Sequence, residues 1–191
     1  STAGDVAAAI GPGLAKAAVA AVVEGETIDL MRPLADGTEL TILTERDEAA
    51  LPVLRHSAAH ILATAVRELR PEAAIGFGPA IDEGFYYDFD VDQPFTPDDL
   101  ERFEEVMAKV IEDDQPFERQ VVSADEARDL FSDDPLKLER LEEFGEDEVI
   151  TVYRNGPFLD LCRGPHVPST GRLKNFKLLN TAGAYWRGDE R

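Results

Sequence analysis

The pattern of hydrophobic and polar residues at the start of the chain predicts a small domain rich in strands. An alanine-rich helix is expected at residues 5–10, where Gly11-Pro12-Gly13 ends it, and three short apolar strands follow at residues 17–23, 27–30 and 40–43. The acidic residues 45–48 then read as a linker. We therefore expect one domain over residues 1–46 and a second over residues 47–191.

The longer part of the chain alternates between helical and strand patterns. Its first helix begins near Leu51 and stops before Pro71, and its apolar stripe predicts that its two histidines lie away from the core. The clearest helix has Thr96 as N-cap and Pro97 as its first residue, and it is predicted to be scaffold. The other expected elements are an aromatic strand at 85–87, a strand at 117–122, a helix at 124–131 behind the capping box of Ser123 and Glu126, a helix at 136–144, a hairpin of strands 149–154 and 158–162 joined at Asn155-Gly156, and last strands at 176–179 and 184–186.

Together these elements predict a two-domain α/β chain of the α+β type, with no sheet running through both halves. The single cysteine excludes an internal disulfide, and neither a signal peptide nor an 18-residue apolar run is present in the sequence. We therefore expect a cytoplasmic protein that does not contact a membrane.

The charge of the chain is unevenly distributed. The net charge of −20 argues against a protein that coats nucleic acid nonspecifically. Residues 151–191, however, carry seven basic and three acidic side chains. This basic end is either a solvated face or a surface that a polyanion approaches.

All three histidines and the only cysteine fall in two five-residue windows, His56-Ser57-Ala58-Ala59-His60 and Cys162-Arg163-Gly164-Pro165-His166. On a helix, His56 and His60 stand on one face, whereas Gly164-Pro165 requires a turn. Taken singly, each of these residues is more often structural than functional. Taken together they favour a shared site, which is either a tetrahedral metal site of the zinc type or a metal-free hydrolytic cleft with histidine as base.

Two further side chains change this picture. Asp160 and Cys162 are two residues apart on a predicted strand, so their side chains point to the same face of that strand. Lys137 lies on a predicted helix and, from its sequence context alone, is expected to be an ordinary surface lysine.

Four motifs resemble the amino-terminal part of threonyl-tRNA synthetase: His56 to His60, Gly84-Phe-Tyr-Tyr-Asp88-Phe-Asp90, Asp160-Leu-Cys162-Arg-Gly-Pro-His166, and Ala184-Tyr-Trp-Arg-Gly-Asp189. In that family a small ubiquitin-like β-grasp domain, called TGS, precedes an editing domain made of an antiparallel sheet and helices. Gly11 to Lys16 resembles the middle of the TGS domain, so the resemblance implies a TGS domain without its first hairpin. It also implies that the class II catalytic and anticodon-binding domains follow in the family, and that this chain does not activate amino acids.

The resemblance implies an aminoacyl-tRNA deacylase that removes serine from the acceptor end of threonine tRNA. His56, His60, Cys162 and His166 would line the pocket, with His56 activating water and Lys137 supporting the developing oxyanion. Tyr87 and Asp160 would contact the substrate. The charge of the basic end, rather than the resemblance, leads us to expect that Arg163, Lys174 and Lys177 contact tRNA. The family site works without metal, so no cofactor is expected, although the four ligand-type side chains leave bound zinc open.

The chemical need for such a site is clear, because a pocket that fits threonine rejects serine by only ~1 to 3 kcal/mol. The position of His56 near the start of its helix predicts a neutral imidazole, since the helix dipole disfavours protonation there. Two alternatives stay open: a zinc-dependent deacylase resembling the alanyl-tRNA editing domain, and a noncatalytic module that only docks the tRNA acceptor end.

Overall fold

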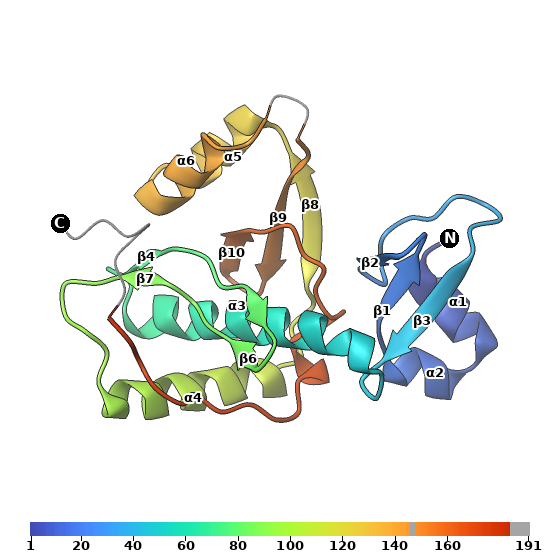
Figure 1. The fold of residues 1–191 in the computed structure, drawn as a ribbon, viewed down its shortest axis with the longest axis horizontal. Helices are drawn as coiled ribbons and strands as arrows, with labels where there is room; N and C mark the ends of the chain where they lie inside the picture. Colours follow the sequence, from blue (N-terminus) through green and yellow to red (C-terminus); the bar gives the residue numbers. More distant parts are fainter. Residues whose placement is uncertain (146–147, 184–191) are drawn as a thin grey trace.

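The computed structural model describes residues 1–145 and 148–183. It has an α+β fold in which helices pack beside two separate three-stranded antiparallel sheets, and the predicted fold class is thereby confirmed (Figure 1). Among the described helices, none is long and apolar enough to cross a membrane.

The amino-terminal part contains two helices and a sheet of strand order β2-β1-β3. Thr2 is the N-cap of helix α1, and its side chain forms a capping box with Asp5. Pro12 begins a second helix that the sequence analysis missed, because proline is well tolerated at a first helical position. The elements are α1 (Ala3–Ile10), α2 (Pro12–Ala17), β1 (Ala18–Val23), β2 (Glu26–Ile28) and β3 (Leu40–Thr44).

The longer part is built around helix α3 (Leu51–Leu69), which follows the short 3-10 helix η1 (Glu48–Ala50). Helix α4 lies alongside α3, and the second sheet, of order β10-β9-β8, stands above them with α5 and α6 at its far end (Figure 1). Its elements are α4 (Pro97–Glu112), β8 (Glu118–Val122), α5 (Ala124–Leu130), α6 (Pro135–Leu141), β9 (Ile150–Asn155), β10 (Phe158–Leu161) and the 3-10 helix η2 (Thr170–Arg172).

Between α3 and α4 the chain forms two small two-stranded sheets. These pair β4 (Ala74–Ile75) with β7 (Phe89–Asp90), and β5 (Ala80–Ile81) with β6 (Gly84–Phe85). The predicted aromatic strand is therefore mostly wrong, since Tyr86 and Tyr87 lie outside any strand. The Tyr87 hydroxyl reaches β10, where it donates a hydrogen bond to Asp160.

The main hydrophobic core joins the two parts of the chain. Val19 and Ala20 of β1 and Leu43 of β3 pack in one buried cluster with residues of α3 and α4, among them Val53, Ile61 and Met107. The two three-stranded sheets share no strand. The amino-terminal part is thus a separate sheet that packs on the start of α3.

Several sequence predictions are confirmed element by element. Helix α4 has the expected Thr96 cap and buried stripe, α5 has the Ser123 and Glu126 capping box, and β9 and β10 form the expected hairpin. Residues 176–179, however, form no strand. They run along α4 as extended chain, where the Leu178 N–H donates to Glu104 at 2.6 Å. The predicted strand 184–186 lies outside the described residues.

Candidate active site

Helix α3 places His56 and His60 one turn apart, and the prediction that both lie away from the core is wrong for His60. Its side chain is 2% exposed, because its ring is enclosed by the edges of Phe117, Phe158 and His166. Neither ring nitrogen has a hydrogen-bond partner among the described residues. Burial therefore lowers the pKa of His60 to about 4, so this imidazole is neutral at physiological pH.

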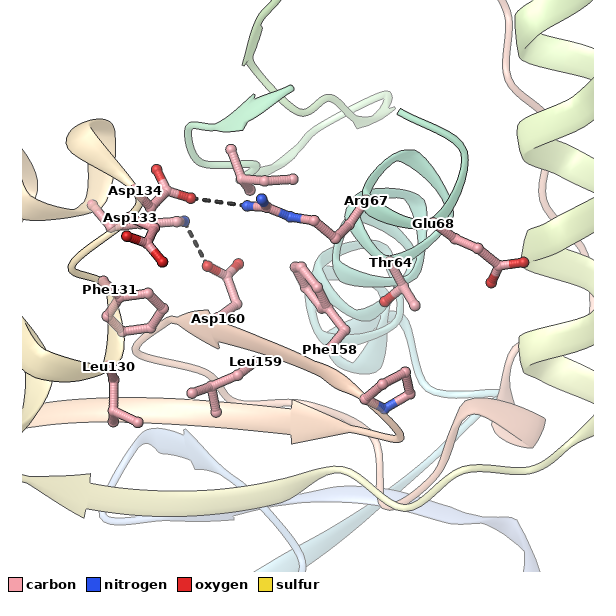
Figure 2. Close-up of a pocket in the computed structure, with 13 residues that line it drawn as sticks. Thr64, Arg67, Glu68, Leu130, Phe131, Asp133, Asp134, Phe158, Leu159 and Asp160 are labelled. Atoms are coloured by element: carbon pink, nitrogen blue, oxygen red, sulfur yellow. Dashed lines mark hydrogen bonds and ion pairs between the residues drawn. The ribbon is translucent and has the colours of Figure 1, made fainter. Parts of the chain in front are cut away.

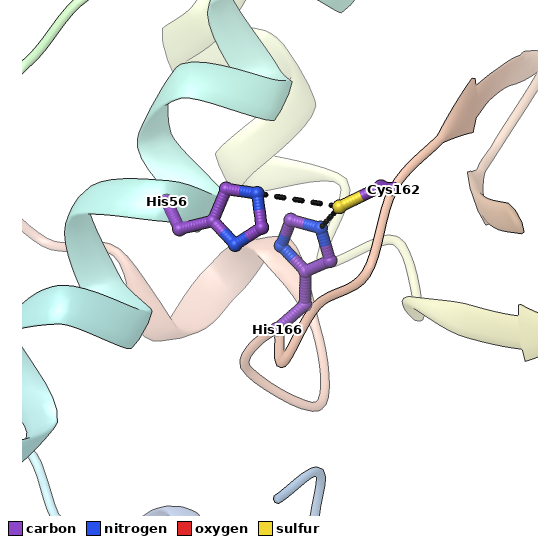
Figure 3. Close-up of side chains that lie close together, drawn as sticks. All are labelled: His56, Cys162 and His166. Atoms are coloured by element: carbon purple, nitrogen blue, oxygen red, sulfur yellow. Dashed lines mark hydrogen bonds between the residues drawn. The ribbon is translucent and has the colours of Figure 1, made fainter. Parts of the chain in front are cut away.

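His56, Cys162 and His166 meet at a single sulfur atom (Figure 3). The Cys162 Sγ lies 3.2 Å from His56 Nε2 and 3.3 Å from His166 Nε2, and it accepts the Gly164 N–H at 3.3 Å. His56 comes from α3, while Cys162 and His166 flank the turn after β10. The structure thus brings together three of the four side chains that the two sequence windows singled out.

The hydrogen bonds around Ser57 assign the protons in this cluster. The buried Ser57 hydroxyl accepts the Val167 N–H at 3.1 Å and lies 3.0 Å from His166 Nδ1. Nδ1 is the only acceptor found for that hydroxyl among the described residues, so Ser57 donates to it and the His166 proton sits on Nε2. His166 Nε2–H then donates to Cys162 Sγ, which leaves the thiol proton for His56 Nε2.

Burial sets the charge state of every member of the cluster. It raises the pKa of the Cys162 thiol, helped by the nearby Asp160 carboxylate, and it lowers the pKa of His166 well below the ordinary value. The pKa of His56 is also lowered, mainly by burial, against the opposing effects of the Pro165 carbonyl and of Asp160. His56 is therefore neutral as predicted, but burial is the cause: it lies in the second turn of α3, beyond the reach of the helix dipole.

Lys137 is buried, 3% exposed, and the prediction of a surface lysine is wrong. Helix α6 directs its ammonium between the β4 segment and β10, where it lies 2.5 Å from Asp160 Oδ1 and donates to the Gly76 carbonyl at 2.5 Å. It also donates to the Tyr87 hydroxyl at 3.3 Å, and that hydroxyl donates to Asp160 Oδ2 at 2.5 Å. The ammonium group is thus held by one ion pair and two hydrogen bonds.

This ring of contacts keeps Asp160 ionised. Burial alone would raise the pKa of its carboxyl group, but the Lys137 charge and the hydrogen bonds from Lys137 and Tyr87 hold the pKa below its usual range. The pKa of Tyr87 is raised well above the ordinary value by burial and by the Asp160 charge, so its proton stays on the hydroxyl. A buried carboxylate thus lies on the same strand face as the Cys162 thiol.

A cavity of about 390 Å³ opens beside this ring of contacts (Figure 2). Asp160 and Lys137 form part of its wall, and Arg67 forms an ion pair of 2.9 Å with Asp134 across it. Phe131, Phe158 and Leu159 make much of the remaining wall apolar. Asp160 lines it, whereas His56, Cys162 and His166 do not.

The three side chains predicted to contact tRNA are exposed, and each has an acidic partner. Lys174 lies 2.6 Å from Glu45, Lys177 lies 2.7 Å from Glu104, and Arg163 pairs with Glu148. Arg163 directly follows Cys162 in the turn of the site, whereas Lys174 and Lys177 pair with residues outside the site. Their side chains stay about two-thirds exposed, so their positive charge is only partly compensated.

Three of the four ligand-type groups could hold a metal ion. The ligand atoms of His56, Cys162 and His166 all lie within 4.8 Å of one another, whereas His60 does not belong to this group. A tetrahedral site of the four predicted ligands is therefore not formed. A metal bound here would also have to displace the proton of the half-buried thiol, whose pKa is raised.

Sequence reasoning missed several residues that shape the site. Ser57 lies inside the first histidine window, where its position between two histidines was a usable signal. Asp29 accepts the His166 backbone N–H at 2.9 Å, and Gly76 contributes only a carbonyl. Neither of these contacts leaves a mark in the local sequence, because each comes from an element far away along the chain.

Comparisons with known proteins match two segments of the chain to described domains. Residues 1–44 match the TGS domain, and residues 150–191 match the second additional domain of threonyl and alanyl tRNA synthetases. A threonine–tRNA ligase of Pelobacter propionicus is 54% identical over 193 aligned residues that include the whole of this chain. The resemblance to threonyl-tRNA synthetase is thereby confirmed.

Other threonine–tRNA ligases are similar to nearly the whole of this chain as well. One from Staphylococcus aureus is 50% identical over 189 residues, or 99% of this chain. The chain spans only about 30% of the length of these relatives, namely 30% in Pelobacter propionicus and 29% in Staphylococcus aureus. The likeness to threonyl-tRNA synthetase is therefore a likeness to one part of it. The match to the second additional domain includes Asp160, Cys162 and His166.

Proposed function

We propose that this chain hydrolyses the ester bond that joins serine to threonine tRNA, and so proofreads mischarged tRNA. The observation that carries the proposal is the pairing of a neutral histidine and thiol cluster with a buried, ionised Asp160 on one strand face. Such clusters of perturbed ionisable groups are typical of active sites. The match of residues 150–191 to the second additional domain of threonyl and alanyl tRNA synthetases supports tRNA as the substrate class.

His56 is the general base in this proposal. His60 and His166 are 2% and 1% exposed, so neither can meet a water molecule without rearrangement, whereas His56 is only partly buried. Its unprotonated nitrogen, Nε2, faces the Cys162 thiol, and a thiol is a weak donor that water can replace. The neutral state of His56 leaves this nitrogen free to accept a proton.

The hydrolysis then proceeds in two steps, attack of water and cleavage of the ester bond. Water attacks the ester carbonyl carbon while His56 takes one of its protons, which gives a tetrahedral intermediate with a negative oxygen. The bond from the carbonyl carbon to the ribose oxygen then breaks, and His56 returns the proton to that oxygen. The products are free serine and tRNA with an intact 3′ end.

Asp160 is the anchor for the substrate ammonium group. Its carboxylate is held ionised by Lys137 and Tyr87 and lines the cavity. It is 4% exposed, so neighbouring side chains must move before it forms a charge-assisted hydrogen bond to the substrate. Because the ammonium group of Lys137 is held by Asp160, Gly76 and Tyr87, Lys137 supports a developing oxyanion through its charge. Tyr87 remains a protonated donor for the same carboxylate.

We also propose that hydrolysis needs no metal. The position of His60 outside the ligand cluster supports this proposal. The convergence of His56, Cys162 and His166 favours zinc as the second candidate, and a zinc-dependent deacylase is the corresponding alternative function.

One assay separates these possibilities. The chain is purified without added metal, analysed for zinc, and incubated with seryl-tRNA and threonyl-tRNA in the presence and absence of chelator. We expect release of serine, little release of threonine, and no effect of the chelator. Stoichiometric zinc whose removal abolishes release would establish the zinc alternative, and no release under either condition would refute the deacylase proposal.

A further inference from the structure

Asp29 of the amino-terminal part reaches the cluster around Cys162. It directly follows β2, and each of its carboxylate oxygens accepts one hydrogen bond from the longer part of the chain. Oδ1 accepts the backbone N–H of His166 at 2.9 Å, and Oδ2 accepts the hydroxyl of Tyr153 at 2.7 Å. Asp29 thus accepts two hydrogen bonds. One donor, Tyr153, belongs to β9, and the other, His166, ends the turn after β10.

The two donors define the shape of the turn between Cys162 and His166. Gly164 in that turn has φ +69°, and a Cβ added there would come within 2.1 Å of the Tyr153 hydroxyl oxygen. The Tyr153 ring also meets the His166 ring edge-on, with 4.7 Å between centroids. Tyr153 therefore fills the space beneath the turn, and Asp29 fixes both its hydroxyl and the His166 backbone.

His166 is consequently held at two points that come from different parts of the chain. Asp29 holds its backbone N–H, and Ser57 of α3 holds its ring at Nδ1. Only with both points fixed does Nε2 lie 3.3 Å from the Cys162 sulfur, which in turn orients His56. A shift of the turn would separate the thiol from both imidazoles, because hydrogen bonds weaken steeply with misalignment.

We propose that Asp29 is a positioning residue of the hydrolytic site, so that the TGS domain completes the site built by the longer part of the chain. The effect on hydrolysis rests on the proposed deacylase function, whereas the effect on the turn does not. A simple packing contact between the two parts would predict a change in stability alone.

The single cysteine provides a direct reporter of the turn. The rate of Cys162 alkylation by iodoacetamide is measured at one neutral pH in folded wild-type chain and in Asp29→Ala, Asp29→Asn, Tyr153→Phe and Asp36→Ala. Asp36 is an exposed carboxylate of the same domain and serves as the matched control. The fraction folded is followed by thermal unfolding for each variant.

We expect Asp29→Ala to raise the alkylation rate by about threefold or more, because the turn loosens and a charge that opposes thiolate formation is lost. Asp29→Asn keeps an acceptor for the His166 N–H and should fall between Asp29→Ala and wild type, while Asp36→Ala should match wild type. In seryl-tRNA hydrolysis, Asp29→Ala should lower kcat by about tenfold or more with little change in KM.

The two readouts fail separately. If the wild-type chain does not hydrolyse seryl-tRNA, the deacylase proposal is wrong, and alkylation alone then decides on Asp29. If Asp29→Ala lowers only the unfolding temperature, and leaves alkylation and kcat as in Asp36→Ala, Asp29 is a packing contact and the inference is overturned.

Discussion

At the scale of single residues, the site combines neutral and ionised groups, most of them buried, with His56 and Cys162 only partly buried. His60 illustrates the cost of this arrangement, because its two buried ring nitrogens have no hydrogen-bond partner within residues 1–145 and 148–183. An unsatisfied buried polar group destabilises the folded state, so a protein keeps one only where packing or function requires it. His60 touches the ring of His166 and the two phenylalanines that surround it.

The pKa of His60 predicts how the stability of the chain depends on pH. Folded His60 has a pKa of about 4 against an ordinary value of 6.5, so the unfolded chain binds the extra proton between these values. Its share of the stability is complete above pH 6.5 and is lost as pH falls toward 4, which amounts to about 3 kcal/mol. The lowered pKa of His166 acts in the same direction.

We expect His60→Leu to stabilise the chain by about 1 to 3 kcal/mol at pH 7, because leucine fills a similar volume without unsatisfied nitrogens. The advantage over wild type should grow as pH falls from 6.5 to 4.5. Urea unfolding at several pH values measures both effects. A variant that is less stable than wild type, with an unchanged pH dependence, would show that His60 has polar partners in solution.

At the scale of elements, Lys137 ties α6 to β10 and to the segment after β4. Its ammonium is the only described cation in direct contact with Asp160. Removing one member of a buried ion pair leaves the other charge without compensation, which is more costly than removing both.

We therefore expect Lys137→Met to destabilise the chain by about 3 to 5 kcal/mol. The double variant Lys137→Met with Asp160→Asn should recover part of that loss. Chemical unfolding of the two single variants and the double variant completes the cycle. Equal stability of Lys137→Met and wild type would show that the pair does not form in solution.

The elements that could be predicted from sequence are those whose signals are local. The Thr96 cap of α4, the Ser123 capping box of α5 and the turn after Asn155 each depend on a few neighbouring residues, and all are present. The pairing of the two histidine windows was likewise predictable, because it used rare residue types at helix and turn spacing.

The features that could not be predicted from sequence depend on contacts between segments that are far apart along the chain. Lys137 has the local context of a surface lysine, and only Asp160 and Gly76 from other elements make its burial favourable. The apolar stripe of α3 predicted that His60 lies away from the core, yet the β9 and β10 hairpin covers this side of the helix: Thr64, one turn after His60, donates to Asn155 at 3.3 Å. Residues 176–179 alternate like a strand but pair with α4 through Glu104.

At the scale of the whole molecule, the net charge of −20 opposes the approach of tRNA. The basic side chains Lys174 and Lys177 lie in exposed ion pairs, and such pairs contribute little to stability. A phosphate could therefore replace the carboxylate partner at small cost, and the acidic partner competes with tRNA for the cation.

Two charge variants test this competition. We expect Glu45→Gln to strengthen tRNA binding, since it frees Lys174, and Lys177→Ala to weaken it and lower the slope of log affinity against log salt by about one. Glu39→Gln, at an exposed carboxylate of the amino-terminal part, is the control for the change in net charge. Binding of tRNA is measured across a series of salt concentrations. Equal affinities for Glu45→Gln and Glu39→Gln would remove Lys174 from the tRNA surface.

The central claim is that His56 is the base of a metal-free seryl-tRNA deacylase. The most direct measurement is single-turnover release of serine from seryl-tRNA by wild type and His56→Ala in the presence of chelator, with tRNA affinity measured in parallel. We predict that wild type releases serine, and that His56→Ala releases it slower by a factor of about a hundred or more, with nearly unchanged tRNA affinity. Release by His56→Ala at the wild-type rate, or a loss of affinity without a loss of rate, would contradict the account.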